Sequence, residues 1–193
     1  MYPDAHCELN YQTPFQLLIA TILSAQCTDI MVNRVTEKLF AQYPDAPSLS
    51  TASIEEIENL IKSIGLFKNK ARFLSLSSKM LVDEFGGQVP SKMEELIRMP
   101  GVGRKTANVV LSNAFDIHQG VVVDTHVRRI TFRLGLTKHK DVDKIEEDLM
   151  KIVPQKLWGM FSHWIIFLGR RQCFARNPNC ETCALNNSCA KII

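Results

Sequence analysis

Helix signals recur along nearly the whole chain and constrain its fold more than any other feature. Apolar residues repeat at helical spacing, Ser, Thr or Asp stands before most repeats, and glycine or proline follows several of them. We expect helices over residues 13–26, 27–44, 53–65, 69–87, 91–99, 104–115, 124–135, 143–153 and 155–170. The only strand-like run is VVVDT at 121–125, and three valines cannot establish a sheet. The sequence therefore predicts an all-α fold.

Side-chain caps indicate where several of these helices begin. Two capping boxes are visible, formed by Ser53 with Glu56 and by Ser91 with Glu94. Asp124 is the expected N-cap of the helix that follows the valine run. The charged stretch 138–144 is interpreted as a solvated linker, and the next helix is expected to start at Asp143.

Composition and charge narrow the class of protein. The chain has 193 residues and a formal net charge of +3, which permits nucleic-acid binding through a local patch without requiring it. No apolar run reaches the roughly eighteen residues of a membrane-spanning helix. The N-terminus has no basic region followed by an apolar run, so no signal or transit peptide is visible. We therefore expect a cytoplasmic protein with no membrane partner.

Four of the six cysteines crowd into the C-terminal part of the chain. They are Cys173, Cys180, Cys183 and Cys189, spaced C-x6-C-x2-C-x5-C. Because no export signal is visible, such clustered thiols indicate a metal site before disulfides. Zinc sites usually pair their ligands in two similar knuckles, whereas a cubane iron–sulfur cluster tolerates unequal loops. The spacing favours a cluster and leaves zinc open.

A glycine-containing turn, PGVG at 100–103, links two of the expected helices. Its glycines permit unusual backbone angles and let another backbone approach closely. The helix that follows begins with unpaired N–H groups, which attract an anion such as a DNA phosphate. The turn therefore suits a duplex backbone regardless of base sequence.

Lys105 stands in the first turn of that helix, beside Arg104. An ammonium is disfavoured at the positive end of a helix dipole next to a second cation, and only a neutral amine can attack carbon. Taken locally, Lys105 is a nucleophile or simply a solvated phosphate contact. The carboxylate of Asp124, further along the chain, makes the first interpretation more attractive if the two share a cleft.

Five motifs occur in one order along the chain: LSAQCTD (23–29), IGLFKNKA (64–71), MPGVGRKTANVV (99–110), VVDTHV (122–127) and the cysteine tail. Together they resemble the endonuclease III family, which comprises DNA glycosylases of the helix–hairpin–helix superfamily. The resemblance covers the chain from about Tyr2 to Cys189. Relatives usually carry one further N-terminal helix, and this chain begins where that helix would end.

The resemblance implies two helical domains with the DNA cleft between them. Residues 8–117 would form a six-helix domain, with the helix–hairpin–helix motif at about 92–115. Residues 1–7 together with 118–193 would form a helical iron–sulfur domain. The cysteine tail accordingly implies a [4Fe–4S] cluster as cofactor.

The same resemblance implies a repair enzyme that removes oxidised pyrimidines, of the thymine-glycol type, from damaged double-stranded DNA and cleaves the abasic site by β-elimination. Lys105 would form a Schiff base with the sugar, and Asp124 would stabilise charge at C1′. Gln26 would fill the space of the extruded base, and Leu66 would wedge into the opposite strand. The other implied DNA contacts are Gly101, Val102, Gly103, Arg104, Thr125 and His126.

A monomeric prokaryotic enzyme acting at the nucleoid is expected. Two alternatives stay open. One is a base-only mismatch glycosylase that uses an activated water. The other is a non-catalytic helix–hairpin–helix DNA-binding protein with a metal-stapled tail.

Overall fold

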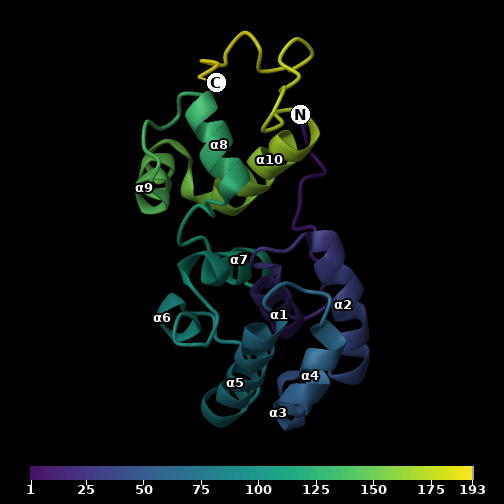
Figure 1. Cartoon of the computed structure of the whole chain (residues 1–193). Helices are drawn as coiled ribbons and strands as arrows, with labels where there is room; N and C mark the ends of the chain where they lie inside the picture. Colours follow the sequence, from purple (N-terminus) through teal and green to yellow (C-terminus); the bar gives the residue numbers. More distant parts are fainter. Residues whose placement is uncertain (193) are drawn as a thin grey trace. The chain divides into compact units, whose positions relative to one another are not determined.

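A computed structural model describes residues 1–192 of the chain. Over that range the regular structure is helical and contains no strand, which confirms the all-α prediction. The chain divides into two compact units (Figure 1). We call residues 8–117 the hairpin unit and residues 1–7 with 118–192 the cysteine unit. No helix in the described range is long and apolar enough to cross a membrane.

The hairpin unit is built around one completely buried helix. Residues 15–23 of α1 are all buried, so apolar neighbours surround this helix instead of covering a single stripe. Those neighbours come from α2, α5 and α7. The helices of the unit are α1 (Pro14–Ser24), α2 (Asp29–Gln42), α3 (Ala46–Thr51), α4 (Ile54–Ile61), α5 (Phe67–Phe85), α6 (Met93–Leu96) and α7 (Arg104–Ala114).

The first predicted capping box is confirmed and the second is wrong. The Ser53 side chain accepts a hydrogen bond from the Glu56 amide, and Glu56 returns to the Ser53 backbone. In contrast, α6 is one turn long, has Lys92 at its N-cap and receives no side-chain cap. Ser91 therefore lies one residue too early, and its hydroxyl is out of register with the amide that a capping box requires.

Helix α3 was not expected from the sequence. Its capping box is formed by Asp45 and Ser48, and a proline occupies its first turn, where no backbone N–H is needed. A short run of proline, serine and threonine has the composition of a loop. The segment is nevertheless helical, and the cap stabilises it by satisfying amides at the start of this helix of six residues.

The cysteine unit packs its helices around a second apolar core. Its elements are α8 (Thr125–Arg133), α9 (Val142–Ile152), the 3-10 helix η1 (Gln155–Leu157) and α10 (Trp158–Arg171). The core includes Val121, Val123, Val127, Ile130, Ile145, Leu149, Trp158, Ile165 and Leu168. The valine run is thus an extended buried segment that leads into α8, and the single helix expected at 155–170 is split into η1 and α10.

The N-terminal segment belongs to the cysteine unit because it packs on the end of α10. The Tyr2 ring meets the Phe167 ring edge-on, with the ring centroids 6.2 Å apart. The Arg171 guanidinium lies 4.1 Å from the centroid of the Phe167 ring and donates a hydrogen bond of 3.1 Å to Asp4. One cation therefore joins an aromatic ring of α10 to a carboxylate near the start of the chain.

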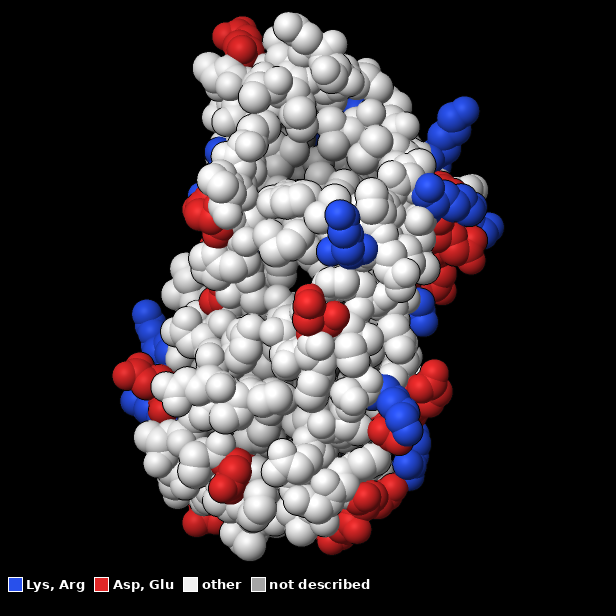
Figure 2. All heavy atoms as spheres, turned by 180° about the vertical axis from the view of Figure 1, so that it is seen from behind, with Lys and Arg blue, Asp and Glu red and all other residues white. Residues whose placement is uncertain are grey.

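Charged side chains are scattered over the visible surface. On the face drawn in Figure 2, lysines and arginines are interspersed with aspartates and glutamates, and neither sign forms a continuous block. This distribution agrees with the small net charge of +3. Any contact with a polyanion on this face would therefore depend on individual side chains and backbone donors rather than on a broad basic surface.

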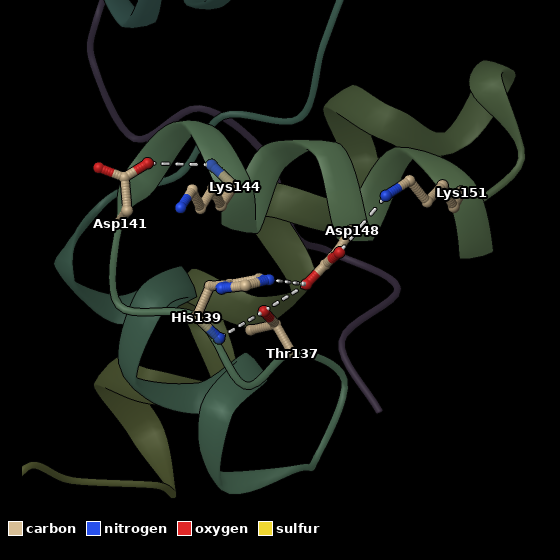
Figure 3. Close-up of polar contacts among 6 residues, drawn as sticks. All are labelled: Thr137, His139, Asp141, Lys144, Asp148 and Lys151. Carbon is tan, nitrogen blue, oxygen red and sulfur yellow. Dashed lines mark hydrogen bonds and ion pairs between the residues drawn. The ribbon is translucent and has the colours of Figure 1, made fainter.

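The stretch interpreted as a solvated linker is anchored to α9 (Figure 3). The Thr137 hydroxyl donates a hydrogen bond of 2.7 Å to Asp148, and the imidazole Nε2 of His139 lies 3.9 Å from the same carboxylate. The helix N-cap is Asp141, which accepts from the Lys144 amide at 3.2 Å, so the start predicted at Asp143 is two residues late. Residues 138–144 are all exposed, as the solvated interpretation expected, but the stretch is also tied to the start of a helix instead of being a plain linker.

Asp148 gives this anchor a pH dependence. The hydrogen bond from Thr137, followed by the charges of His139 and Lys151, lowers the pKa of the Asp148 carboxyl. A folded-state pKa below the unfolded one stabilises the fold above the unfolded pKa, and this contribution is lost as the pH falls through the folded pKa. Asp148→Asn should therefore lower the midpoint of thermal unfolding at neutral pH, and the deficit should shrink below about pH 4.

Thermal unfolding followed by circular dichroism at both pH values tests this expectation. Asp143→Asn, on the same helix, is the matched control. A deficit of the Asp148 variant that stays constant into acid would contradict the assignment.

Candidate active site

The hairpin between α6 and α7 is fixed by close contact with α5. Gly101 has a φ of +80°, and a Cβ atom added there would lie 2.9 Å from Cδ2 of Phe73. The Ser77 hydroxyl, one turn further along α5, donates a hydrogen bond of 2.9 Å to the Pro100 carbonyl. The glycine is therefore required both by its left-handed backbone and by the aromatic ring packed against it.

The start of α7 leaves its first amides without a side-chain cap. Gly103 is the N-cap residue, and no side-chain oxygen accepts from the first turn. Arg104 and Lys105 are both exposed in that turn, and Val102 is buried beneath it. Backbone donors and two cations thus face solvent at the positive end of a helix, an arrangement that suits a phosphate.

Gln26 and Leu66 share an uncommon backbone conformation. Both are non-glycine residues with positive φ, 54° at Gln26 and 59° at Leu66. Gln26 is exposed in the turn after α1, and the Leu66 side chain, at the N-cap of α5, is 60% exposed. A left-handed residue costs roughly 1–2 kcal/mol, and such strain collects at functional sites. The two predicted wedge residues are therefore presented outward at a conformational cost.

Lys70 contacts the segments that carry both of these residues. Its side chain is buried, and Nζ donates hydrogen bonds to the Leu23 carbonyl at 2.9 Å and to the Ala25 carbonyl at 2.7 Å. Its backbone amide donates to the Leu66 carbonyl at 3.1 Å. The sequence interpretation did not single out Lys70. The sequence does contain an indication that Lys70 is buried, because it falls at helical spacing among the buried residues of α5.

Asp124 occupies the N-cap of α8, as predicted. One carboxylate oxygen accepts a hydrogen bond of 2.7 Å from the Val127 amide. The side chain is half-buried, and the neighbouring Thr125 is exposed. The carboxylate is therefore held in one orientation at the start of a helix.

The imidazole of His126 is fixed within the cysteine unit. Nη2 of Arg129 lies 3.2 Å from Nδ1 of His126. A Cβ atom at Gly169 of α10 would lie 2.7 Å from the same nitrogen, so the ring packs closely against that helix. These contacts support a structural role for His126, in addition to the DNA contact that was expected from the sequence.

The four clustered cysteines line one cavity of the cysteine unit. All six cysteines of the chain are free thiols, so the cluster does not form disulfides. Apolar side chains close much of the cavity wall. The lining includes Cys173, Cys180, Cys183 and Cys189 together with Ile130, Leu134, Leu168 and Leu185.

N–H groups of the protein lie close to two of these cysteine sulfurs. Among the described residues, no group of three or more His, Cys, Asp or Glu side chains is arranged to hold a metal ion. Nη1 of Arg133 lies 3.4 Å from the Cys173 sulfur, and the Lys191 amide lies 3.4 Å from the Cys189 sulfur. N–H donors to sulfur are a normal feature of cluster sites.

Two arginines of α8 hold the segment that begins at Cys173. Arg129 donates to the Cys173 carbonyl at 3.1 Å. Arg133 donates to the carbonyls of Phe174 at 2.7 Å and Ala175 at 2.9 Å. Neither arginine was singled out in the sequence, because no local pattern reveals that its partners lie some forty residues away.

The helical hairpin, its uncapped helix start and the cysteine-lined cavity define a class of DNA repair protein. Residues 19–155 match the family model of the HhH-GPD superfamily, described as base excision DNA repair proteins. The endonuclease III of Synechocystis is 56% identical over 98% of this chain and 86% of that protein. A trapped covalent complex of endonuclease III with DNA is 48% identical, with a TM-score of 0.93 over 99% of this chain and 90% of that one.

The chain belongs to the endonuclease III family, whose members are DNA glycosylases and abasic-site lyases. A thermostable thymine-DNA glycosylase is less similar, at 25% identity and a TM-score of 0.85 over 94% of this chain and 85% of that one. Duplex DNA is the partner that follows from the family, and the family generally carries a [4Fe–4S] cluster.

The contact between Gly101 and Phe73 generates a stability prediction. Gly101→Ala should destabilise the hairpin unit by at least about 1–2 kcal/mol, because the new methyl group meets an aromatic ring and the backbone stays left-handed. Gly65→Ala is the matched control, since its backbone is not left-handed and nothing lies near the added Cβ. Urea unfolding of both variants measures the difference. Equal losses of stability would contradict the proposed contact.

Proposed function

We propose that the chain removes oxidised pyrimidines of the thymine-glycol type from duplex DNA and then cleaves the abasic strand, acting at the nucleoid of a prokaryotic cell. The observation that carries this proposal is the exposed Lys105 in the first turn of α7, directly after the hairpin. The similar solved structure is a trapped covalent intermediate with DNA, so a covalent bond to DNA is the natural role for this lysine. Lys105 lies in the hairpin unit and Asp124 in the cysteine unit.

The first step is extrusion of the damaged base, because its reacting sugar carbon is shielded while the base is stacked. Unstacking costs a few kcal/mol and is least for a damaged base. The Gln26 amide would hydrogen-bond to the orphaned base, and the apolar Leu66 would replace lost stacking in the opposite strand. Their exposure and their fixed backbone support this role, since a wedge must project before it meets DNA.

The hairpin would hold the backbone of the damaged strand during this step. Amides of Gly101, Val102 and Gly103 and the Arg104 side chain are donors for phosphate oxygens. Thr125, exposed beside Asp124, would contact the nucleotide near the reacting sugar, and His126 would contribute through its packed ring. Such contacts do not depend on the base sequence. Damage would therefore be selected by how readily the base leaves the stack.

The chemical step begins with the neutral amine of Lys105. Its nitrogen attacks C1′ and forms a C–N bond, while the bond from C1′ to the base breaks and the base leaves with the electron pair and a proton. The Asp124 carboxylate would stabilise the positive charge that develops on the sugar. Opening of the sugar ring converts the adduct to a Schiff base between Lys105 and C1′.

Strand cleavage follows from the Schiff base. Loss of a C2′ proton drives β-elimination, which breaks the bond between C3′ and its oxygen and releases the downstream strand with a 5′ phosphate. Hydrolysis of the imine then frees Lys105. No electron leaves or enters in this sequence, so the [4Fe–4S] cluster would serve structure rather than redox chemistry.

The four cysteine thiolates would hold that cluster, whose iron–sulfur bonds tie the tail of the cysteine unit together. Within the protein, Arg133 would orient Cys173, and the Lys191 amide would donate to Cys189. The cluster would thereby order a segment that contains few regular hydrogen bonds of its own.

Borohydride trapping tests the role of Lys105. Reduction should covalently link the protein to duplex DNA containing thymine glycol or an abasic site, because borohydride reduces the imine to a stable amine. Lys105→Gln should abolish trapping and leave duplex binding intact. Lys92→Gln, another exposed lysine of the hairpin unit, is the matched control and should trap normally.

The alternatives give different results in this experiment. A base-only glycosylase would release the base but fail to trap, and a DNA-binding protein without catalysis would do neither. Trapping that persists in Lys105→Gln would assign the nucleophile to another amine.

Iron analysis tests the cofactor. The purified protein should be yellow-brown and contain iron, and Cys183→Ser should lose iron and lower the stability of the cysteine unit. Cys27→Ser, in the hairpin unit, is the matched control and should keep its iron. A colourless protein that contains zinc would overturn the cluster assignment.

A further inference from the structure

Lys70 is a buried cation at the junction of the two wedge segments. Lys70 is 4% exposed, and its ammonium donates hydrogen bonds to two backbone carbonyls at the end of α1. The turn after those carbonyls carries Gln26, and the residue that starts the first turn of Lys70's own helix is Leu66. One residue therefore contacts both segments through different atoms.

The ammonium of Lys70 places a positive charge at the C-terminal end of α1. The last turn of that helix contains no basic residue, and its C-cap is Ala25, whose side chain cannot donate. The C-terminal end of a helix carries partial negative charge, and a cation there is stabilising. Lys70 brings that cation from α5, with charge-assisted hydrogen bonds of 2.9 Å and 2.7 Å.

The backbone of Lys70 fixes the other segment. Leu66 is the N-cap of α5, and no side chain caps that helix. The amide of Lys70 donates to the Leu66 carbonyl and closes the first helical turn. Leu66, with its left-handed backbone, therefore lies within one helical turn of the residue whose Nζ bonds to the end of α1.

We propose that Lys70 is a positioning residue that sets Gln26 and Leu66 relative to each other, so that both enter the DNA together when the base is extruded. The proposal rests on the proposed function, in which these two residues fill the gap. Lys70 touches neither DNA nor the reacting atoms in this scheme. It acts by holding two strained segments at one spacing.

A purely structural role would be met as well by an apolar side chain. Burial lowers the pKa of Lys70, so its charged form is retained at a cost. Replacing a buried ionic interaction by a well-packed apolar residue is often neutral for stability. Lys70→Met preserves length and volume but loses both hydrogen bonds, and it can therefore separate positioning from folding.

The test uses a duplex in which 2-aminopurine stands opposite a stable abasic analogue. Its fluorescence reports unstacking of the orphaned base. Single-turnover base removal from thymine glycol in duplex DNA, abasic-site cleavage in single-stranded DNA and affinity for undamaged duplex are measured beside it. The variants are Lys70→Met, Lys70→Gln, Gln26→Ala and Leu66→Ala, with Thr21→Val as a matched control on α1 whose hydroxyl bonds only within that helix.

Lys70→Met should lose the fluorescence rise and remove the base from duplex DNA about tenfold more slowly, close to the effect of one lost charge-assisted hydrogen bond. Cleavage of single-stranded abasic DNA and affinity for undamaged duplex should match the parent, because neither requires a wedge in an opposite strand. The unfolding midpoint should also match, because methionine fills the same buried volume. Lys70→Gln should show the same pattern in weaker form, and it decides the question if Lys70→Met fails to fold. Thr21→Val should behave as the parent.

The outcomes separate this proposal from the one on which it rests. If Gln26→Ala and Leu66→Ala change neither fluorescence nor rate, the wedge roles are wrong. If those variants are impaired but both Lys70 variants behave as the parent, positioning by Lys70 alone is wrong. A parallel fall of every activity with the unfolding midpoint would make Lys70 merely structural and would also overturn the proposal.

Discussion

The contact of one face of α5 with its neighbours is the constraint on which the hairpin unit depends. Phe73 packs where a Cβ of Gly101 would stand, and Ser77 bonds the Pro100 carbonyl. Lys70 precedes Phe73 by one turn, so the three side chains follow helical spacing along one face. The same face thus holds the end of α1 and the turn that presents Lys105. The segments that carry Lys105, Gln26 and Leu66 are therefore all held by contacts with this one helix.

The helices of the hairpin unit divide by how their first amides are satisfied. Side chains cap α1 to α4, and none caps α5 to α7. Those side-chain caps are Thr13, Thr28, Asp45 and Ser53. A side-chain cap occupies donors that an anion would need, and the start of α7 has no such cap. The uncapped start of α7 is therefore compatible with the proposed phosphate contact.

Local sequence signals predict the parts of this structure that local physics determines. The caps of α4 and α8 could be predicted because a side-chain oxygen reaches an amide only a few residues away. The Ser91 pattern failed because a capping box works only where the backbone is already helical, and α6 starts later. Met93, the first residue of α6, is buried, and the packing around it is a tertiary feature that no short window of sequence contains.

Much of the candidate site required more than local signals. The roles of Lys105, Asp124, Gln26 and Leu66 came from the order of motifs along the whole chain, and they remain predictions. Lys70 and Phe73 could not be assigned from the sequence because their partners lie on other elements. A lysine at a buried helical position is an anomaly that periodicity can detect, but only the fold reveals which carbonyls it serves.

The cysteine unit carries an electrostatic argument of its own. Arg129 and Arg133 stand one turn apart on α8, and both point at the segment that begins at Cys173. Burial and the charge of Arg133 lower the pKa of Arg129, whereas a negative charge on Cys173 raises it. Two neighbouring guanidinium groups repel each other, and the Asp124 carboxylate together with the carbonyl oxygens that accept from them offsets this repulsion. Thiolates at the cavity wall would add further negative charge beside these arginines, in agreement with the proposed cluster.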